Sequence, residues 1–309
     1  MSRIEEVLVV GAGSVGREIA LQCAMCGYRV TVCDISREVL HEARAVIEMH
    51  ARTLSPAYVP EPAAAILGRI YYTLDLEEAL ATADIVSESA PEDVVVKRAL
   101  FARMGALAPP HTIFTTNSSS LTPSMIADAT GRPDQFLALH FHKTVWVSNL
   151  VDVMPHPGTR PETIEAVTAF ARSIRQTPIL MAKERPSYVF NAMLEAYNGA
   201  ALLLWHQGFV GFEDIDRAWM IAQCMDHGPF GGMDMIGIDT LYDVVRIHAD
   251  AGYVEAPAIA EHLKTEFLDR GLLGLKSGQG FYTYPNPSYR ADSFLGIDPI
   301  VMPAARAAR

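Results

Sequence analysis

The chain has 309 residues, half of them hydrophobic and a fifth charged, with a formal net charge of −11. This apolar content excludes a disordered chain, and the acidic balance argues against nucleic acid or an anionic membrane as a partner. Because the four cysteines are too few for a disulfide framework and no apolar run is long enough to span a membrane, we expect a soluble, cytoplasmic protein. Its length exceeds that of a usual single core, which predicts two packed regions.

The first region begins as an alternation of strand, turn, helix and strand. An apolar run predicts a buried strand over 7–10, helical spacing of apolar residues predicts a helix over 17–25, and a second strand is expected over 28–33. The turn after the first strand reads Gly11-Ala12-Gly13-Ser14-Val15-Gly16. Its glycines permit a tight turn, an approach of backbone N–H groups to a pyrophosphate, and close packing of the helix on the strand. This arrangement is typical of a dinucleotide-binding site.

An acidic residue closes the second strand. Asp34 lies roughly 20 residues beyond the last glycine, where a carboxylate can accept hydrogen bonds from both ribose hydroxyls of NAD. Its negative charge disfavours the 2′-phosphate of NADP, although Arg37 keeps NADP open as an alternative. We therefore predict NAD as the cofactor.

Further strands follow, and polar residues gather at their carboxyl ends. Strands are expected over 69–73, from 85, and over 112–116, with helices over 38–52 and around Lys97. The strand that ends at 116 leads into the polar turn Asn117-Ser118-Ser119-Ser120-Leu121. Open α/β sheets bind their ligands at this edge, so we interpret the serines as hydrogen-bonding groups for a bound polar molecule, with capping of the turn as the alternative.

The next two strands carry a histidine and an acid. The strand over 136–139 ends at His140, and Asp152 is the single acid in the strand over 150–154. A buried acid needs a partner, and a carboxylate that accepts Nδ1–H from histidine makes the ring a stronger base. The pair could remove a hydroxyl proton as hydride leaves. Structural roles for both residues, or a metal site that also uses His142, remain as alternatives.

The second region is predicted to be helical. A boundary is expected near Lys183, after a strand over 178–182 and before Pro186, which lies close to the next helix start. The predicted fold class is therefore α/β, with a Rossmann-type doubly wound sheet over 1–182 followed by a second, all-helical domain over 183–309. The apolar faces of its helices favour packing against a partner chain.

These motifs together resemble those of the L-3-hydroxyacyl-CoA dehydrogenases. The resemblance covers the glycine turn, the helix with Glu92 and Lys97, and the serine turn. Its remaining segments are His140-Phe141-His142-Lys143-Thr144, Leu150-Val151-Asp152-Val153, Pro186-Ser187-Tyr188-Val189-Phe190-Asn191, Gly228-Pro229-Phe230 and Lys276-Ser277-Gly278-Gln279-Gly280-Phe281-Tyr282. The implied reaction is NAD-dependent interconversion of an L-3-hydroxyacyl-CoA thioester and its 3-keto form.

The resemblance also implies roles for individual residues. His140 would be the general base, oriented by Asp152 in place of the usual glutamate. Ser119 and Asn191 would hold the reacting oxygen. The cofactor would be bound by the glycine turn together with Asp34, Glu92, Lys97, Ser119 and Lys276. No resident metal is implied, and the C-terminal helices would form a homodimer.

Several departures from the family pattern leave the substrate open. Lys143 and Thr144 replace the usual Asn-Pro, His142 replaces Phe, and residues 35–70 lack the lysines that help family members to bind CoA. The alternatives to a CoA thioester are a carrier-protein thioester and a free hydroxy acid such as L-gulonate or L-carnitine. A non-catalytic, NAD-binding structural protein is the alternative outside the enzymes, and the retained set of polar residues argues against it.

Overall fold

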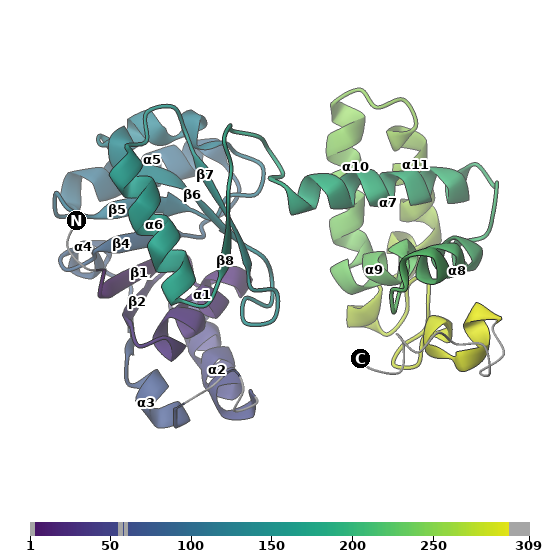
Figure 1. The fold of residues 1–309 in the computed structure, drawn as a ribbon, viewed down its shortest axis with the longest axis horizontal. Coiled ribbons are helices and arrows are strands. Elements are labelled where there is room, and N and C mark those ends of the chain that lie inside the picture. The colour runs from purple at the N-terminus through teal and green to yellow at the C-terminus, as the bar shows by residue number, and fades with distance from the viewer. Residues whose placement is uncertain (1–3, 55–57, 59–60, 297–309) are drawn as a thin grey trace. The chain divides into compact units, whose positions relative to one another are not determined.

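An eight-stranded, mostly parallel sheet organises the first part of the chain (Figure 1). The computed structural model describes residues 4–54, 58 and 61–296. The chain divides into two units, Met1–Phe190 and Asn191–Arg309. The first contains the sheet and its helices, and the described part of the second is built from helices and short 3-10 turns. The predicted fold class, a Rossmann-type sheet followed by an all-helical region, is confirmed.

The strand order reverses near the centre of the sheet. The strands are β1 (Glu6–Val10), β2 (Arg29–Cys33), β3 (Ile70–Thr73), β4 (Ile85–Glu88), β5 (Ile113–Thr116), β6 (Phe136–Phe141), β7 (Leu150–Pro155) and β8 (Thr177–Leu180). Their order is β3-β2-β1-β4-β5-β6-β7-β8, and each neighbouring pair is parallel except β6 with β7. The order reverses between β1 and β4, which is where doubly wound sheets bind ligands.

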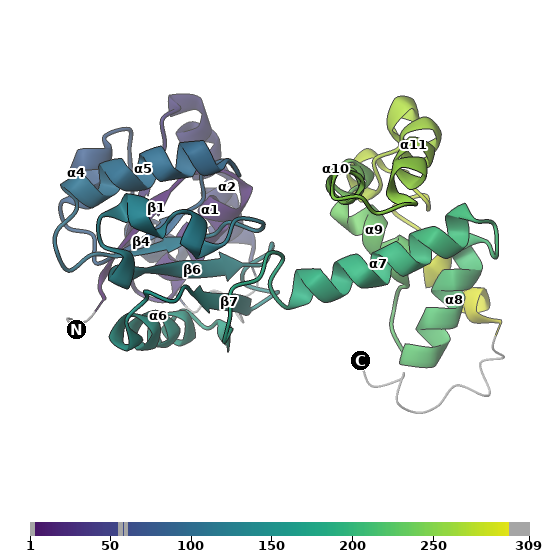
Figure 2. The ribbon, with the colours of Figure 1, turned by 90° about the horizontal axis from the view of Figure 1, so that it is seen from above.

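Helices cover both faces of the sheet, which explains the unbroken apolar runs in its strands. These helices are α1 (Ser14–Met25), α2 (Arg37–Thr53), α3 (Ala63–Leu67), α4 (Leu76–Leu80), α5 (Val94–Leu107) and α6 (Pro161–Ser173). Along β1, Val7 and Val9 pack in one cluster with α1, α2 and α6, whereas Leu8 and Val10 pack in the other with α4 and α5. Figure 2 shows α5 and α6 on opposite sides of the sheet.

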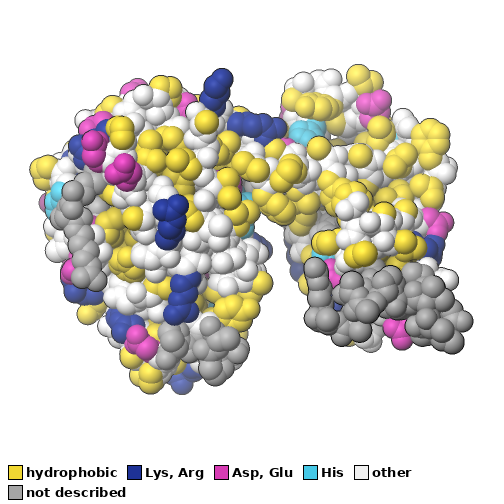
Figure 3. Space-filling model, viewed as in Figure 1, with side chains coloured by type: hydrophobic (Ala, Val, Ile, Leu, Met, Phe, Trp, Pro, Cys, Tyr) yellow, Lys and Arg dark blue, Asp and Glu magenta, His cyan; other side chains and the backbone are white. Residues whose placement is uncertain are grey.

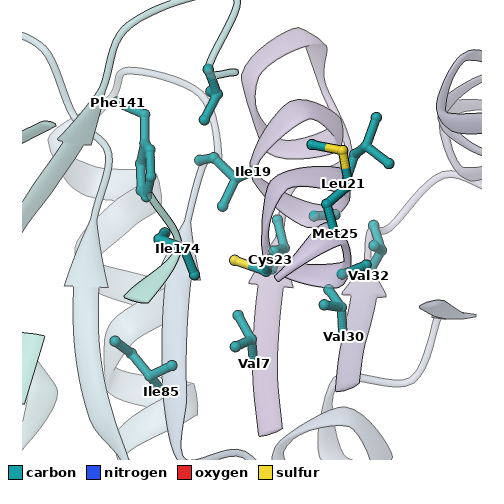
Figure 4. Close-up of a cluster of buried hydrophobic side chains, with 14 of the residues drawn as sticks. Val7, Ile19, Leu21, Cys23, Met25, Val30, Val32, Ile85, Phe141 and Ile174 are labelled. Atoms are coloured by element: carbon teal, nitrogen blue, oxygen red, sulfur yellow. The ribbon is translucent and has the colours of Figure 1, made fainter. Parts of the chain in front are cut away.

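The packing of α1 against the strands is tight and apolar. In Figure 4, Cys23 of α1 lies over the strand that carries Val7, and Ile19 lies on the side of α1 that faces Phe141. Cys23 is fully buried, and burial raises the pKa of its thiol. The N-terminus of α1 follows the carboxyl end of β1 through the glycine turn.

The helical unit packs around aromatic residues and two buried aspartates. Its helices are α7 (Phe190–His206), α8 (Phe212–Gln223), α9 (Pro229–Ile236), α10 (Ile238–Asp250) and α11 (Ala256–Glu266). Asp216 accepts backbone hydrogen bonds from Phe230 (2.8 Å) and Gly231 (2.9 Å), so it caps α9. Helices α4, α6 and α9 were not expected from the sequence; α9 is only eight residues long.

Apolar side chains also lie on the surface of the helical unit (Figure 3). They come from several helices and one loop, and include Met193, Phe209, Ile221, Met235 and Ile247, each more than two fifths exposed. No helix in the described part of the chain combines the length and hydrophobicity needed to cross a membrane.

Candidate active site

The glycine turn leaves room for a ligand at one of its three glycines. Gly11 has a φ of +99°, and a Cβ there would lie 2.5 Å from the Ser89 carbonyl oxygen. A Cβ on Gly16 would overlap the carbonyl oxygen of Gly11. Gly13 has an ordinary φ of −64°, and a Cβ there would meet no protein atom within 4 Å. The fold requires the outer glycines, whereas Gly13 leaves open space at the N-terminus of α1, where a pyrophosphate would bind.

Asp34 lies beside this turn, as expected. Its Oδ2 accepts a hydrogen bond from the backbone N–H of Ala12 (2.8 Å), and its Oδ1 accepts one from Ser36 (3.0 Å). The adjacent Ile35 is completely exposed and Arg37 is exposed at the start of α2. The carboxylate is thus held next to the turn with lone pairs left for ribose hydroxyls.

A buried ion pair ends β4. Lys97 and Glu88 are at most 1% exposed, and the Lys97 Nζ donates to the Glu88 Oε1 at 2.6 Å. Glu88 also accepts from the Thr116 hydroxyl (2.6 Å) and the Ala90 backbone N–H (2.6 Å). Lys97 was expected at the cofactor. Its Nζ also lies 3.7 Å from the Glu92 Oε2, so Glu92 is a more distant partner of this lysine. Sequence reasoning missed Glu88; a lone acid ending an apolar strand at the ligand edge was the available signal.

Glu92 organises the serine turn. One of its oxygens accepts hydrogen bonds from the Ser118 hydroxyl (2.5 Å) and from both the backbone N–H (2.7 Å) and the hydroxyl (2.8 Å) of Ser120. Burial opposes ionisation of Glu92, but these hydrogen bonds outweigh it and lower the pKa of the carboxyl. Two of the three serines therefore stabilise the turn, and the middle one, Ser119, faces elsewhere.

Ser119, His140 and Asp152 form a hydrogen-bonded series. The antiparallel register of β6 and β7 places Asp152 directly opposite His140. The His140 Nδ1 lies 3.3 Å from the Asp152 Oδ2, and its Nε2 lies 3.1 Å from the Ser119 Oγ. His140 is 4% exposed and Asp152 is fully buried. The structure therefore brings together three of the residues that were predicted for catalysis.

Tyr188 holds the histidine ring in place, and sequence reasoning did not assign it a role. Its ring stacks on His140, with centroids 4.4 Å apart and an angle of 8° between the planes. Its hydroxyl donates to the Ser118 carbonyl oxygen at 2.6 Å. Tyr188 joins the histidine to the serine turn, and only the fold reveals this contact.

The electrostatics favour a neutral imidazole beside a carboxylate anion. Burial lowers the pKa of His140, although the hydrogen bond to Asp152 partly opposes this effect. Burial acts against ionisation of Asp152, but hydrogen bonds from His140 and His142 lower the pKa of the carboxyl. With Nδ1–H directed to Asp152, His140 has the lone pair of Nε2 directed to Ser119.

A second histidine contacts the same carboxylate oxygen. The His142 Nε2 lies 3.0 Å from the Asp152 Oδ2, and the ring meets Phe190 edge-on with centroids 5.3 Å apart. The loop that follows is held by Glu18, which accepts from the backbone N–H of Thr144 at 2.7 Å. Thr144 has a φ of 63°, an uncommon conformation for a residue with a side chain. Lys143, between them, is exposed.

Two predicted site residues belong to the helical unit. Asn191 is the second residue of α7 and is half-buried. Lys276 lies in a 3-10 turn over Leu275–Ser277 and forms an ion pair with Asp239. Their roles toward substrate and cofactor stay predictions.

Known proteins match this chain over most of its length. Residues 6–185 match the 3-hydroxyacyl-CoA dehydrogenase NAD binding domain, and residues 188–284 match the 3-hydroxyacyl-CoA dehydrogenase C-terminal domain. The human mitochondrial hydroxyacyl-coenzyme A dehydrogenase is 31% identical over 293 residues, which cover 91% of each chain.

Solved structures agree with this result. A diketoreductase, whose structure is described as substrate-directed dual catalysis of dicarbonyl compounds, has a TM-score of 0.86 and 38% identity, covering 92% of this chain and all of its own. An (S)-3-hydroxybutyryl-CoA dehydrogenase from Ralstonia eutropha has a TM-score of 0.78 and 28% identity, covering 91% of this chain and 99% of its own.

A doubly wound sheet with a dinucleotide turn after its first strand is typical of the nicotinamide-dependent oxidoreductases. The chain belongs to the 3-hydroxyacyl-CoA dehydrogenase family. Its cofactor is NAD, which fits the open space at Gly13 and the carboxylate of Asp34. The family resemblance and the choice of NAD are both confirmed.

Proposed function

We propose that the protein oxidises the hydroxyl group of an L-3-hydroxyacyl-CoA thioester, with His140 as the general base. The observation that carries this proposal is the hydrogen-bonded series Ser119–His140–Asp152, with distances of 3.1 and 3.3 Å. Residues 1–182 would bind the cofactor, and residues 183–309 would contribute substrate contacts and a homodimer interface.

The residues of this chain divide the reaction between them. The His140 Nε2 takes the hydroxyl proton, while Asp152 keeps Nδ1–H in place and stabilises the imidazolium that forms. Ser119 donates a hydrogen bond to the oxygen that changes from hydroxyl to carbonyl, with Asn191 proposed as its second partner. NAD, held by the glycine turn and Asp34, would supply the hydride acceptor for this oxidation. Reduction of the keto form reverses each step.

A smaller, free substrate is a second candidate, and two observations favour it. Residues 35–70 contain the arginines that would have to bind a CoA phosphate in place of the missing lysines. Two of them are paired with glutamates instead, Arg44 with Glu48 (3.1 Å) and Arg69 with Glu61 (2.6 Å). Lys143 offers an exposed cation next to the histidines. These features suit a compact hydroxy acid or dicarbonyl compound, in line with the similarity to a diketoreductase.

A substrate panel tests both candidates. Purified protein is assayed by NADH absorbance with 3-hydroxybutyryl-CoA, its pantetheine and carrier-protein thioesters, L-gulonate and L-carnitine, and in reverse with a small dicarbonyl compound. We expect the highest kcat/KM with the CoA thioester. Activity on free compounds alone would replace the thioester by the second candidate.

The proposed base is tested in the same assay. The change His140→Ala should lower kcat by at least about 100-fold, the lower end for a general base, because it removes the proposed proton acceptor. The exposed His111 in the same unit provides the matched control His111→Ala. Turnover of His140→Ala close to that of the control would overturn the assignment.

A further inference from the structure

We propose that His140, His142 and Asp152 form a binding site for a divalent transition-metal ion such as Zn²⁺, and that the bound ion switches off the base. The binding itself is independent of the proposed function. The loss of activity rests on the proposed role of His140.

Two of the three distances between the donor atoms are close to those around a tetrahedral ion. The Asp152 Oδ2 lies 3.0 Å from the His142 Nε2 and 3.3 Å from the His140 Nδ1, and a ligand atom from each residue lies within 4.8 Å of the others. Ligands 2.0–2.1 Å from a tetrahedral zinc ion are separated by roughly 3.4 Å. Coordination would therefore replace the two hydrogen bonds and place the two imidazole nitrogens about 3.4 Å apart.

The fold holds these ligands in place before any ion arrives. His140 and Asp152 are opposite each other in the β6–β7 pair. The His140 ring is stacked on Tyr188 and meets the His142 ring edge-on, with centroids 5.1 Å apart. The ring of Phe190 also packs edge-on against the His142 ring. Rigid ligands lose little conformational freedom on binding a metal.

The chemistry of the donors selects the ion. Two imidazoles and one carboxylate suit Zn²⁺ and Co²⁺, whereas Mg²⁺ and Ca²⁺ prefer oxygen ligands. Asp152 has a second buried oxygen, Oδ1, for which the described residues provide no hydrogen-bond partner. A positive charge beside Asp152 would therefore stabilise its buried carboxylate. The side chain of His142 is 10% exposed, so this ligand reaches solvent, and a water molecule would complete a tetrahedral set.

Metal binding and base function exclude each other because they need opposite tautomers. An ion on the His140 Nδ1 requires that this atom carry no proton. The proton of the neutral ring then resides on Nε2, where it donates to the Ser119 Oγ at 3.1 Å. The lone pair that would accept the hydroxyl proton is lost. No electron transfer or net proton release from His140 is needed for this exchange.

The test uses Co²⁺ as a probe, since its visible absorption reports coordination without any assay of activity. Metal-free full-length protein should bind one Co²⁺ per chain, displaced by Zn²⁺ and unaffected by Mg²⁺. His142→Gln retains a polar partner for Asp152 but loses the imidazole ligand. It should weaken Co²⁺ binding at least about tenfold, because even outer partners of a metal contribute that much. If circular dichroism shows that His142→Gln is unfolded, His142→Phe provides a second variant.

A control variant locates the ion. The pair His206 and His262, with their Nδ1 atoms 3.0 Å apart, is another close pair of imidazoles in the described chain. His206→Phe should leave Co²⁺ binding unchanged. Loss of binding in His206→Phe, or equal binding in wild type and both His142 variants, would overturn the proposal.

The activity assay separates the two proposals. Zn²⁺ should inhibit the wild type, and at least about tenfold more Zn²⁺ should be needed with His142→Gln. Binding of Co²⁺ by a wild type that has no dehydrogenase activity would contradict only the proposed function. Full activity in excess Zn²⁺, without Co²⁺ binding, would contradict only the metal site.

Discussion

Gly13 and Gly16 lie on the same turn but are glycines for different reasons. Gly13→Ala should weaken NAD binding about tenfold or more with little loss of stability, because the added methyl would occupy the space beside the pyrophosphate. Gly16→Ala should lower the unfolding temperature, because its methyl would overlap the Gly11 backbone. NADH fluorescence titration and thermal unfolding measure the two effects. Unchanged NADH affinity in Gly13→Ala would contradict the cofactor position.

The charge state of His140 predicts the pH dependence of oxidation. Because burial lowers the pKa of this ring, the neutral base should persist below the ordinary value of 6.5. The kcat/KM for oxidation should stay level from neutral pH and fall only as the pH drops through the lowered pKa. A pH–rate profile measures this limb, and an inflection above 6.5 would contradict it.

The same lowered pKa affects stability. The unfolded chain takes up a proton at His140 more readily than the folded chain, so this residue makes folding less favourable as the pH falls below 6.5. Above that value the imidazole is neutral in both states, and the contribution is constant.

At the scale of elements, Asp234 ties the segment after α11 to α9. Its buried carboxylate accepts backbone hydrogen bonds from Phe281 (2.9 Å) and Tyr282 (2.8 Å). A Cβ on Gly280 would overlap this carboxylate, which explains the glycine before these aromatic residues. The last motif of the family resemblance therefore stabilises the helical unit by connecting its C-terminal segment to α9.

Removal of this carboxylate should destabilise the helical unit. Asp234→Ala leaves buried N–H donors without acceptors and should lower the free energy of unfolding by about 2–5 kcal/mol. The exposed Asp243 on α10 provides the control Asp243→Ala. Urea unfolding followed by circular dichroism measures both variants. An equal effect in the two would mean that the buried acceptor contributes nothing.

At the scale of the whole molecule, the apolar surface of the helical unit bears on assembly. The exposed apolar side chains of the helical unit, with Phe209 73% exposed, support a homodimer. Sedimentation at micromolar concentration should give twice the mass of one chain at both low and high salt, because an apolar interface is not screened by ions. A monomer under these conditions would contradict the proposed dimer.

Much of the cofactor half could be predicted because its signals are local. The strand, the glycine turn, the helix and Asp34 follow one another in the sequence, and each residue type answers a backbone requirement of its neighbours. Helix α9 escaped prediction because eight residues between Gly228 and Gly237 give little periodicity.

The sequence by itself determined the fold class, the cofactor and the set of polar residues at the ends of the strands, since these depend on patterns within a few turns of chain. Only the tertiary structure decided which residues meet. The β6–β7 register placed Asp152 between two histidines, Glu92 withdrew Ser118 and Ser120 into the turn, and Glu88 paired with Lys97. These contacts join residues distant in sequence, and their geometry is set by strand pairing and burial rather than by any local pattern.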